Sequence, residues 1–83
     1  MVRKKDKELA ALGEQIRALR EARNISQEDF ASHSGISRSF YGRIERGQVN
    51  ISASYLIKIA RHLKVEVGEL FPSLSKLDKT KDK

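Results

Sequence analysis

Arginine side chains are concentrated in one short segment, residues 38–46. Arg38, Arg43 and Arg46 all fall within it, and Ser39 would lie one helical turn before Arg43 on the same side of a helix. In the major groove of DNA an arginine can bind the O6 and N7 atoms of guanine with two hydrogen bonds. Most exposed arginines are simply solvated, so this chemistry requires neighbouring elements that hold the segment against a duplex.

Other residues that often do chemistry lack partners in the sequence. His33 and His62 are far apart, with no second histidine or carboxylate at ligand spacing, which argues against a metal site. The serines between positions 26 and 37 have no companion base and suit turns and helix caps. The chain has no cysteine, hence no thiol nucleophile or zinc–thiolate site. We therefore expect no enzyme activity, no cofactor, no metal and no small-molecule ligand.

Two short helices joined by a tight turn should position the arginines. Ser26 and Ser37 are each placed to cap a helix that follows them. Gly35 suits the left-handed position that ends the first helix, and Gly47 stands where the second should stop. Ala31, one turn before Gly35, would let the second helix approach closely. The helices are expected at residues 27–34 and 38–46, an arrangement typical of a DNA-reading helix-turn-helix.

This stretch resembles the lambda-repressor and Cro type of helix-turn-helix regulator. The small Ala31, the turn residue Gly35 and the apolar Ile36 and Ile44 match that pattern. The opening Ser26-Gln27-Glu28 and the closing Ile44-Glu45-Arg46-Gly47 match it too. One departure is Tyr41, where the family usually has an aliphatic residue. The resemblance runs from about residue 12 to residue 71.

The resemblance implies roles for several residues on and around the second helix. It implies base reading by Arg38, Ser39 and Arg43, and a phosphate contact by Gln27. Further contacts with the DNA backbone are expected from Ser37, Arg46, Gln48 and Asn50, although Gln48 and Asn50 could instead belong to an ordinary polar loop. The resemblance also implies an ion pair between Arg20 and Glu45 that holds the second helix to the first helix of the domain.

Two residues of the second helix keep alternative interpretations. The Phe40 ring could touch a thymine methyl or a sugar, or it could be half-buried against the next helix. Gly42 in a helix interior costs roughly 1 kcal/mol relative to alanine. A glycine at this position would allow close approach to the DNA backbone. The alternative is neutral sequence variation within the family.

Hydrophobic spacing predicts three further helices and an all-α, five-helix fold. They are expected at residues 7–23, 53–63 and 67–71, with Ser52 as a cap and with Asn24 and Lys64 as left-handed ends. Residues 1–8 would form a basic N-terminal extension and residues 9–71 the DNA-binding domain. Residues 72–83 would be a charged, disordered tail, because they cannot bury enough apolar surface to fold alone.

Length and charge agree with one small nucleic-acid-binding domain. The chain has 83 residues and a net charge of +6, which favours an anionic partner. The segments 1–8, 9–71 and 72–83 each carry a net charge of +2, so the inner region must bind through the placement of its arginines. No apolar run approaches a membrane span of about 18 residues. We expect a bacterial or phage protein that acts in the cytoplasm.

Such a small reader is expected to act as a homodimer on an inverted repeat, with half-sites about 34 Å apart. Candidate dimer contacts are Ile51, Tyr55, Val65, Val67 and Leu70, which could instead complete the monomer core. The sequence of residues 50–60 resembles that of the controller proteins of restriction–modification operons. Small phage repressors share the same domain architecture. Two rivals stay open: an antitoxin-like protein-interaction module with secondary DNA binding, and a nonspecific packager driven by its basic ends. Repression and activation are not distinguished.

Overall fold

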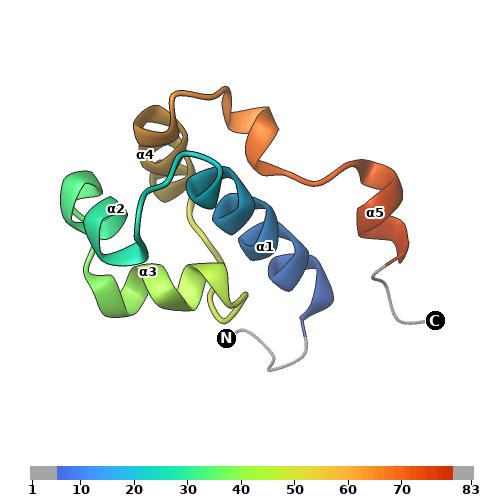
Figure 1. The fold of residues 1–83 in the computed structure, drawn as a ribbon. Helices are drawn as coiled ribbons and strands as arrows, with labels where there is room; N and C mark the ends of the chain where they lie inside the picture. The colour runs from blue at the N-terminus through green and yellow to red at the C-terminus, as the bar shows by residue number, and fades with distance from the viewer. Residues whose placement is uncertain (1–5, 80–83) are drawn as a thin grey trace.

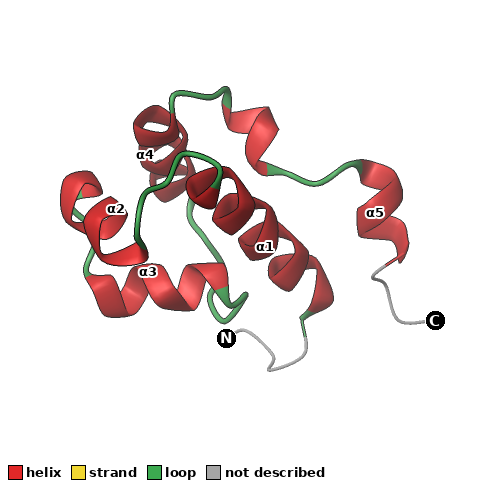
Figure 2. Cartoon of the chain, in the orientation of Figure 1, coloured by secondary structure: helices red, strands yellow, loops and turns green. Residues whose placement is uncertain are grey.

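The computed structural model describes residues 6–79, which fold into five α-helices and one 3₁₀ helix (Figure 1). The α-helices are α1 (Lys7–Glu21), α2 (Gln27–Ser34), α3 (Arg38–Glu45), α4 (Ala53–Leu63) and α5 (Leu74–Lys79), and the 3₁₀ helix η1 (Val67–Leu70) lies between α4 and α5. No strand occurs between residues 6 and 79 (Figure 2). The expected all-α fold class is therefore confirmed.

Serine caps begin three of the helices at the predicted positions. The backbone N–H of Asp29 donates to Ser26 Oγ at 3.0 Å, and that of Phe40 donates to Ser37 Oγ at 3.1 Å. Ser52 Oγ accepts from the N–H of Tyr55 at 3.3 Å. Each bond satisfies an N–H that the first turn of a helix leaves without a partner. The beginnings of α2, α3 and α4 are thus fixed by local sequence.

Two helices end earlier than expected. α1 stops at Glu21 instead of residue 23. The N–H of Arg23 donates to the carbonyl of Arg20, three residues back, at 3.0 Å, which tightens the last turn. Asn24 then takes the predicted left-handed conformation, with φ 58°. α3 stops at Glu45, because Arg46 serves as its C-cap with φ −88° and ψ 0°.

The helix expected at residues 67–71 is the short 3₁₀ helix η1. It ends at Leu70, and Phe71 is extended, with φ −94° and ψ 137°. Pro72 explains this end, since the residue before a proline is disfavoured in the helical region. The N–H of Glu66 donates to Glu69 Oε2 at 2.8 Å, which fixes the start of η1.

The prediction of a disordered tail is wrong for residues 74–79, which form α5. Ser73 Oγ accepts from the N–H of Lys76 at 3.1 Å, and Lys76 Nζ lies 3.5 Å from Glu14 Oε1 of α1. Leu77 is half-buried, so α5 uses the surface of α1 to bury apolar area that it could not bury alone. The rest of the expected tail, residues 80–83, and residues 1–5 of the expected extension lie outside the described residues.

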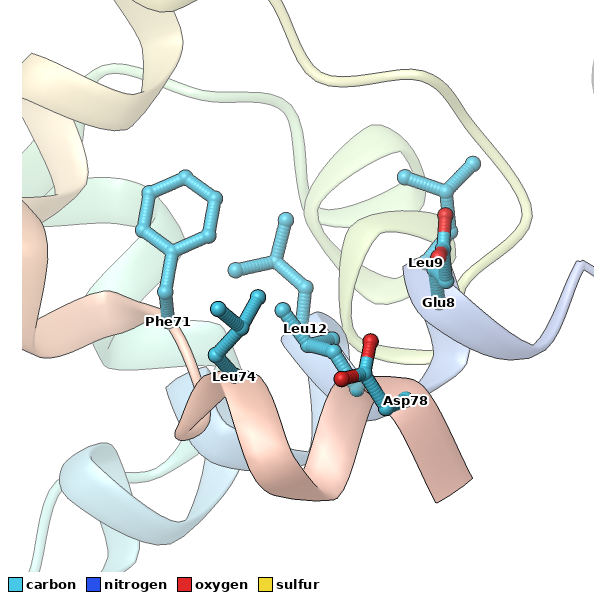
Figure 3. A pocket seen from close by; sticks show the side chains of 7 residues that line it. Glu8, Leu9, Leu12, Phe71, Leu74 and Asp78 are labelled. Carbon is cyan, nitrogen blue, oxygen red and sulfur yellow. The ribbon is translucent and has the colours of Figure 1, made fainter. Parts of the chain in front are cut away.

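A shallow groove of about 290 Å³ separates α5 from the start of α1 (Figure 3). Leu9 and Leu12 of α1 line this groove together with Phe71 and Leu74, and in the close-up Leu12 lies beside Leu74. Leu74 remains 74% exposed, so the contact between these elements is loose.

The core lies where α1 to α4 and η1 converge. Its largest fully buried side chains come from every one of these elements, which makes α3 an integral part of the fold: Ile16, Phe30, Tyr41, Ile44, Ile59, Leu63 and Leu70.

Candidate nucleic-acid interface

The turn between α2 and α3 has the predicted geometry. Gly35 ends α2 in the left-handed conformation, with φ 72°. The N–H of Ile36 donates to the carbonyl of Ala31 at 3.0 Å, and both of these side chains are buried. The small Ala31 is thus buried in the core one turn before Gly35. The turn fixes the angle at which α3 leaves α2.

α3 presents one buried face and one exposed face. Tyr41 and Ile44 are fully buried and Glu45 is buried. Arg38, Ser39, Arg43 and Arg46 are all exposed. The structure thus places three of the predicted base-reading residues, Arg38, Ser39 and Arg43, on the outward side of a helix whose inward side is anchored in the core.

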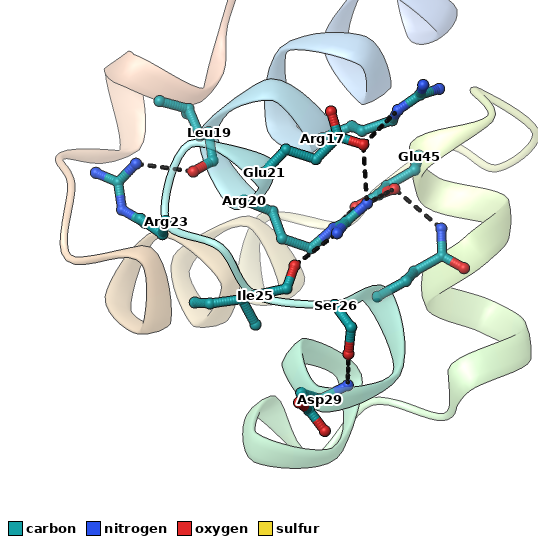
Figure 4. Close-up of polar contacts among 10 residues, drawn as sticks. Arg17, Leu19, Arg20, Glu21, Arg23, Ile25, Ser26, Asp29 and Glu45 are labelled. Carbon is teal, nitrogen blue, oxygen red and sulfur yellow. Dashed lines mark hydrogen bonds and ion pairs between the residues drawn. The ribbon is translucent and has the colours of Figure 1, made fainter.

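Glu45 is the centre of a polar network that joins α1, α2 and α3 (Figure 4). Arg20 of α1 donates from Nε to Glu45 Oε2 at 2.7 Å and from Nη2 to Oε1 at 3.1 Å. Gln27 donates from Nε2 to Glu45 Oε1 at 2.9 Å. The Arg20 Nη1 group donates to the carbonyl of Ile25 at 2.7 Å. The expected Arg20–Glu45 pair is therefore formed, and it also holds Gln27, which the sequence did not reveal.

Both members of this pair are stabilised in their charged forms. Burial alone would raise the pKa of the Glu45 carboxyl, but the hydrogen bonds from Arg20 and Gln27 outweigh it and lower the pKa. The hydrogen bond to Glu45 raises the pKa of Arg20 despite its burial. The network is therefore an ion pair at neutral pH.

Tyr41 departs from the aliphatic residue usual at its position, and its ring packs in the core. Its centroid lies 5.1 Å from that of Phe30. The hydroxyl is buried without a hydrogen-bond partner among the described residues. Burial, and next the neighbouring Glu45 carboxylate, raise the pKa of Tyr41, so this hydroxyl stays neutral.

Two glycines let α1 cross the end of α3 at backbone distance, and this role of Gly13 was not predicted. A Cβ on Gly13 would lie 2.5 Å from the carbonyl oxygens of both Ile44 and Glu45. A Cβ on Gly47 would lie 2.5 Å from the Cα of Ala10. A glycine in the interior of α1 was the available clue, since glycine there disfavours the helix. The close crossing brings Arg20 within reach of Glu45.

The predicted backbone-contact residues flank α3. Ser37, Arg46, Gln48 and Asn50 are exposed and Gln27 is half-buried. Arg46 Nε donates to Gln48 Oε1 at 3.2 Å. These residues border the exposed arginine face from both ends of α3 and from the start of α2.

Phe40 is half-buried, and its ring centroid lies 5.0 Å from that of Tyr55 on α4. Of the two interpretations of Phe40, partial burial against the next helix describes this position. Its part in base reading stays a prediction.

The dimer candidates divide into surface and core. Ile51, Tyr55 and Val65 are half-buried, and Val67 is 37% exposed. Leu70 was wrongly included, because its side chain is 0% exposed in the core. The apolar spacing of Leu70 in the sequence is compatible with the monomer core as well as with a dimer contact. The packing of η1 shows that Leu70 belongs to the core. Ile57, which sequence reasoning missed, is 47% exposed on α4.

The two histidines border a surface pocket at the start of α2, together with Asn24, Ile25, Asp29 and Phe30. His33 Nδ1 lies 2.8 Å from the carbonyl of Asp29, and His62 Nδ1 lies 3.0 Å from that of Lys58. Over residues 6–79, side chains of the metal-binding types do not gather in threes. None of the helices in this range has the length and apolar character needed to cross a membrane.

Known proteins resemble this chain in both sequence and fold. Residues 16–70 match the family described as helix-turn-helix. Control protein C.SmaI of Serratia marcescens is 39% identical over 59 residues, which cover 71% of this chain and 70% of that protein. Control protein C.MunI of a Mycoplasma species is 37% identical over 65 residues, covering 77% and 88%.

Solved structures give the same result. The restriction–modification controller protein C.AhdI from Aeromonas hydrophila has a TM-score of 0.74 and 44% identity, over 76% of this chain and 96% of that one. The controller protein C.Esp1396I, solved as a tetramer in complex with its natural 35-base-pair operator, has a TM-score of 0.68 and 26% identity, over 87% and 91%. The chain belongs to the helix-turn-helix family of transcriptional regulators, and its relatives there include restriction–modification controller proteins.

Proposed function

We propose that this protein is a sequence-specific regulator of transcription that binds duplex DNA by placing α3 in the major groove. The observation that carries this proposal is the division of α3 into two faces. Tyr41 and Ile44 anchor the helix in the core, while Arg38, Ser39 and Arg43 point outward. We place the DNA-binding unit in residues 9–71 and its site of action in the bacterial cytoplasm, where such DNA is found.

Base reading is assigned to the outward side of α3. Arg38 opens the helix, where an N-terminal residue of a recognition helix meets base edges, and Arg43 lies further along it. Each arginine has the two-pronged geometry that guanine accepts, and Ser39 can bond to any base edge that it reaches. Because the Phe40 ring packs against Tyr55, Phe40 supports this surface, and only the exposed edge of the Phe40 ring is available to DNA.

Contacts with phosphates are assigned to the border of this surface. Gln27, at the start of α2, and Ser37, the cap of α3, are placed near one strand. Arg46, Gln48 and Asn50, after α3, would continue along the backbone. Such contacts fix the register of the protein on DNA and supply salt-dependent affinity without reading sequence.

The protein is proposed to act as a homodimer on an inverted repeat. A single α3 covers only a few base pairs, and two-fold pairing doubles the sequence that is read. The apolar surface available for pairing is formed by Ile51, Tyr55, Ile57, Val65 and Val67. The operator complex of C.Esp1396I contains more than one copy of that relative, which supports a symmetric assembly.

Selection from a random duplex library tests this function. We expect an inverted repeat whose half-sites lie about one helical turn, roughly 34 Å, apart. Binding to the selected duplex should remain tighter than binding to a scrambled duplex at every salt concentration tested, because base contacts add to the phosphate contacts that both duplexes offer. Failure to enrich any sequence would contradict the proposal and favour a protein-interaction module or a nonspecific packager.

A further inference from the structure

The pocket between α2 and α4 is built from residues that the proposed DNA contacts do not use. Its volume of about 380 Å³ falls near the lower end of the range for small-molecule sites, about 300–1,000 Å³. Phe30 is buried and Ile25 is half-buried, so the floor is apolar. Four exposed polar side chains surround this floor: Asn24, Asp29, His33 and His62. An apolar floor with a few convergent polar groups is the usual composition of a site for a small organic molecule.

The two histidines offer hydrogen-bond acceptors to this pocket. His33 Nδ1 lies 2.8 Å from the carbonyl oxygen of Asp29, and His62 Nδ1 lies 3.0 Å from that of Lys58. Because a carbonyl oxygen can only accept, each Nδ1 carries a ring proton. In a neutral imidazole the other nitrogen, Nε2, is then unprotonated and accepts a hydrogen bond. Neither Nε2 atom bonds to another residue in the described part of the chain.

Asp29 adds a negative charge to the rim of the pocket. Its exposed carboxylate forms no hydrogen bond or ion pair with residues 6–79. The neighbouring Arg23 is turned away, because its guanidinium donates to the carbonyl of Leu63 at 2.9 Å and to that of Leu19 at 2.8 Å. No arginine or lysine lines this pocket within the described range. The rim therefore combines three free acceptors with a single negative charge.

We propose that this pocket binds a small organic cation with a planar apolar body, such as an aromatic amidine, guanidine or amine. The N–H groups of the cation would donate to the Asp29 carboxylate and to Nε2 of His33 and His62, while its ring covers the apolar floor. An anion would be repelled by Asp29, and a molecule without donors would leave the three acceptors unpaired. The ligand would also contact Phe30, whose ring centroid lies 5.1 Å from that of Tyr41 on α3.

The probe for this site is benzamidine, an aromatic amidine, titrated into the full chain and followed through the backbone N–H signals in NMR spectra. We expect saturable shifts concentrated on the pocket residues, with a dissociation constant on the order of 1 mM, as suits so small a ligand. Benzamide, the neutral analogue, and benzoate, the anionic one, should bind at least about tenfold more weakly. Shifts spread over the whole surface, or benzoate binding as tightly as benzamidine, would overturn the inference.

Three variants test the polar rim, and their melting temperatures without ligand check that each one folds. Asp29→Asn keeps the shape of the side chain but removes its charge, and it should weaken benzamidine binding about tenfold. His62→Phe keeps an aromatic ring and removes one acceptor, so it should weaken binding about threefold or more. Glu28→Gln is the matched control, because Glu28 lies in the same first turn of α2 and does not line the pocket. It should change binding less than about twofold, since exposed charges interact weakly in water.

Equal affinities of Asp29→Asn and Glu28→Gln for benzamidine would contradict the inference. DNA takes no part in these measurements, so their failure would leave the reading of DNA by α3 untouched, and failure of the DNA selection would leave this site untouched.

Discussion

The Arg20 guanidinium on α1 and the Glu45 carboxylate on α3 meet at 2.7 Å in the interior, where their side chains are 8% and 2% exposed. The ion pair holds α3, which carries the exposed arginines, against α1. Because both groups are out of water, removal of one would leave the other charged and buried without its partner, an effect that costs about 3–5 kcal/mol.

We expect Glu45→Gln to destabilise the protein by about that amount at pH 7, measured by urea unfolding. The lowered pKa of Glu45 means that its contribution is present above the ordinary value of 4.5 and is lost as the pH falls through the folded-state pKa. The difference between variant and wild type should therefore shrink in acid. Glu21→Gln, on an exposed carboxylate, is the control and should change stability by less than about 1 kcal/mol. A difference that is independent of pH would contradict this account.

Gly13→Ala tests the close crossing of α1 over α3. The new Cβ would lie 2.5 Å from two carbonyl oxygens, so the helices must separate. We expect a loss of about 2–3 kcal/mol in the free energy of unfolding, even though alanine favours the helix. Gly68→Ala, in open space, should stay within about 0.5 kcal/mol of the wild type. Equal stabilities for the two variants would show that the helices do not touch here.

Tyr41→Phe removes a buried hydroxyl that has no hydrogen-bond partner among the described residues. A buried and unpaired polar group is unfavourable. We therefore expect the free energy of unfolding of the variant, measured by thermal or chemical denaturation, to be about 1 kcal/mol higher than that of the wild type. Tyr55→Phe, at a half-buried position, serves as the control. A loss of stability in Tyr41→Phe would show that the hydroxyl makes a stabilising hydrogen bond to Glu45 and would contradict this prediction.

Local signals allowed much of this fold to be predicted from sequence. Ser26 and Ser37 cap α2 and α3, and Gly35 turns the chain between them. These features depend on a few neighbouring residues, so the sequence contains what is needed to recognise them.

Features that depend on distant packing could not be predicted in the same way. Gly13 meets α3 only because α1 crosses it, and Leu70 is buried only because η1 folds onto α1 and α4. α5 forms against α1 although its own sequence is highly charged. The bond from Gln27 to Glu45 likewise joins residues 18 positions apart. For the candidate site, the exposed arginines and the Arg20–Glu45 pair could be named from sequence, whereas the hydrogen bond that adds Gln27 to this pair could not.

Association through the apolar surface of α4 and η1 is open to a direct test. A carboxylate at Val67 or Ile57 would have to be desolvated in a dimer, so Val67→Glu and Ile57→Glu should sediment as monomers and bind the selected duplex weakly. Leu74→Glu, at an apolar side chain that is 74% exposed in the groove between α5 and α1, is the matched control and should sediment as the wild type does. Dimers in all three variants would place the interface elsewhere.

The most direct test of α3 as the reading element compares the base preferences of wild type and Arg38→Ala at every position of the selected duplex. We expect the variant to lose about 1–3 kcal/mol of binding free energy on the preferred sequence and to lose its preference at one base pair in each half-site, with the other positions unchanged. An equal loss on all sequences, with every preference retained, would show that Arg38 contacts only the backbone and would contradict the placement of α3 in the groove.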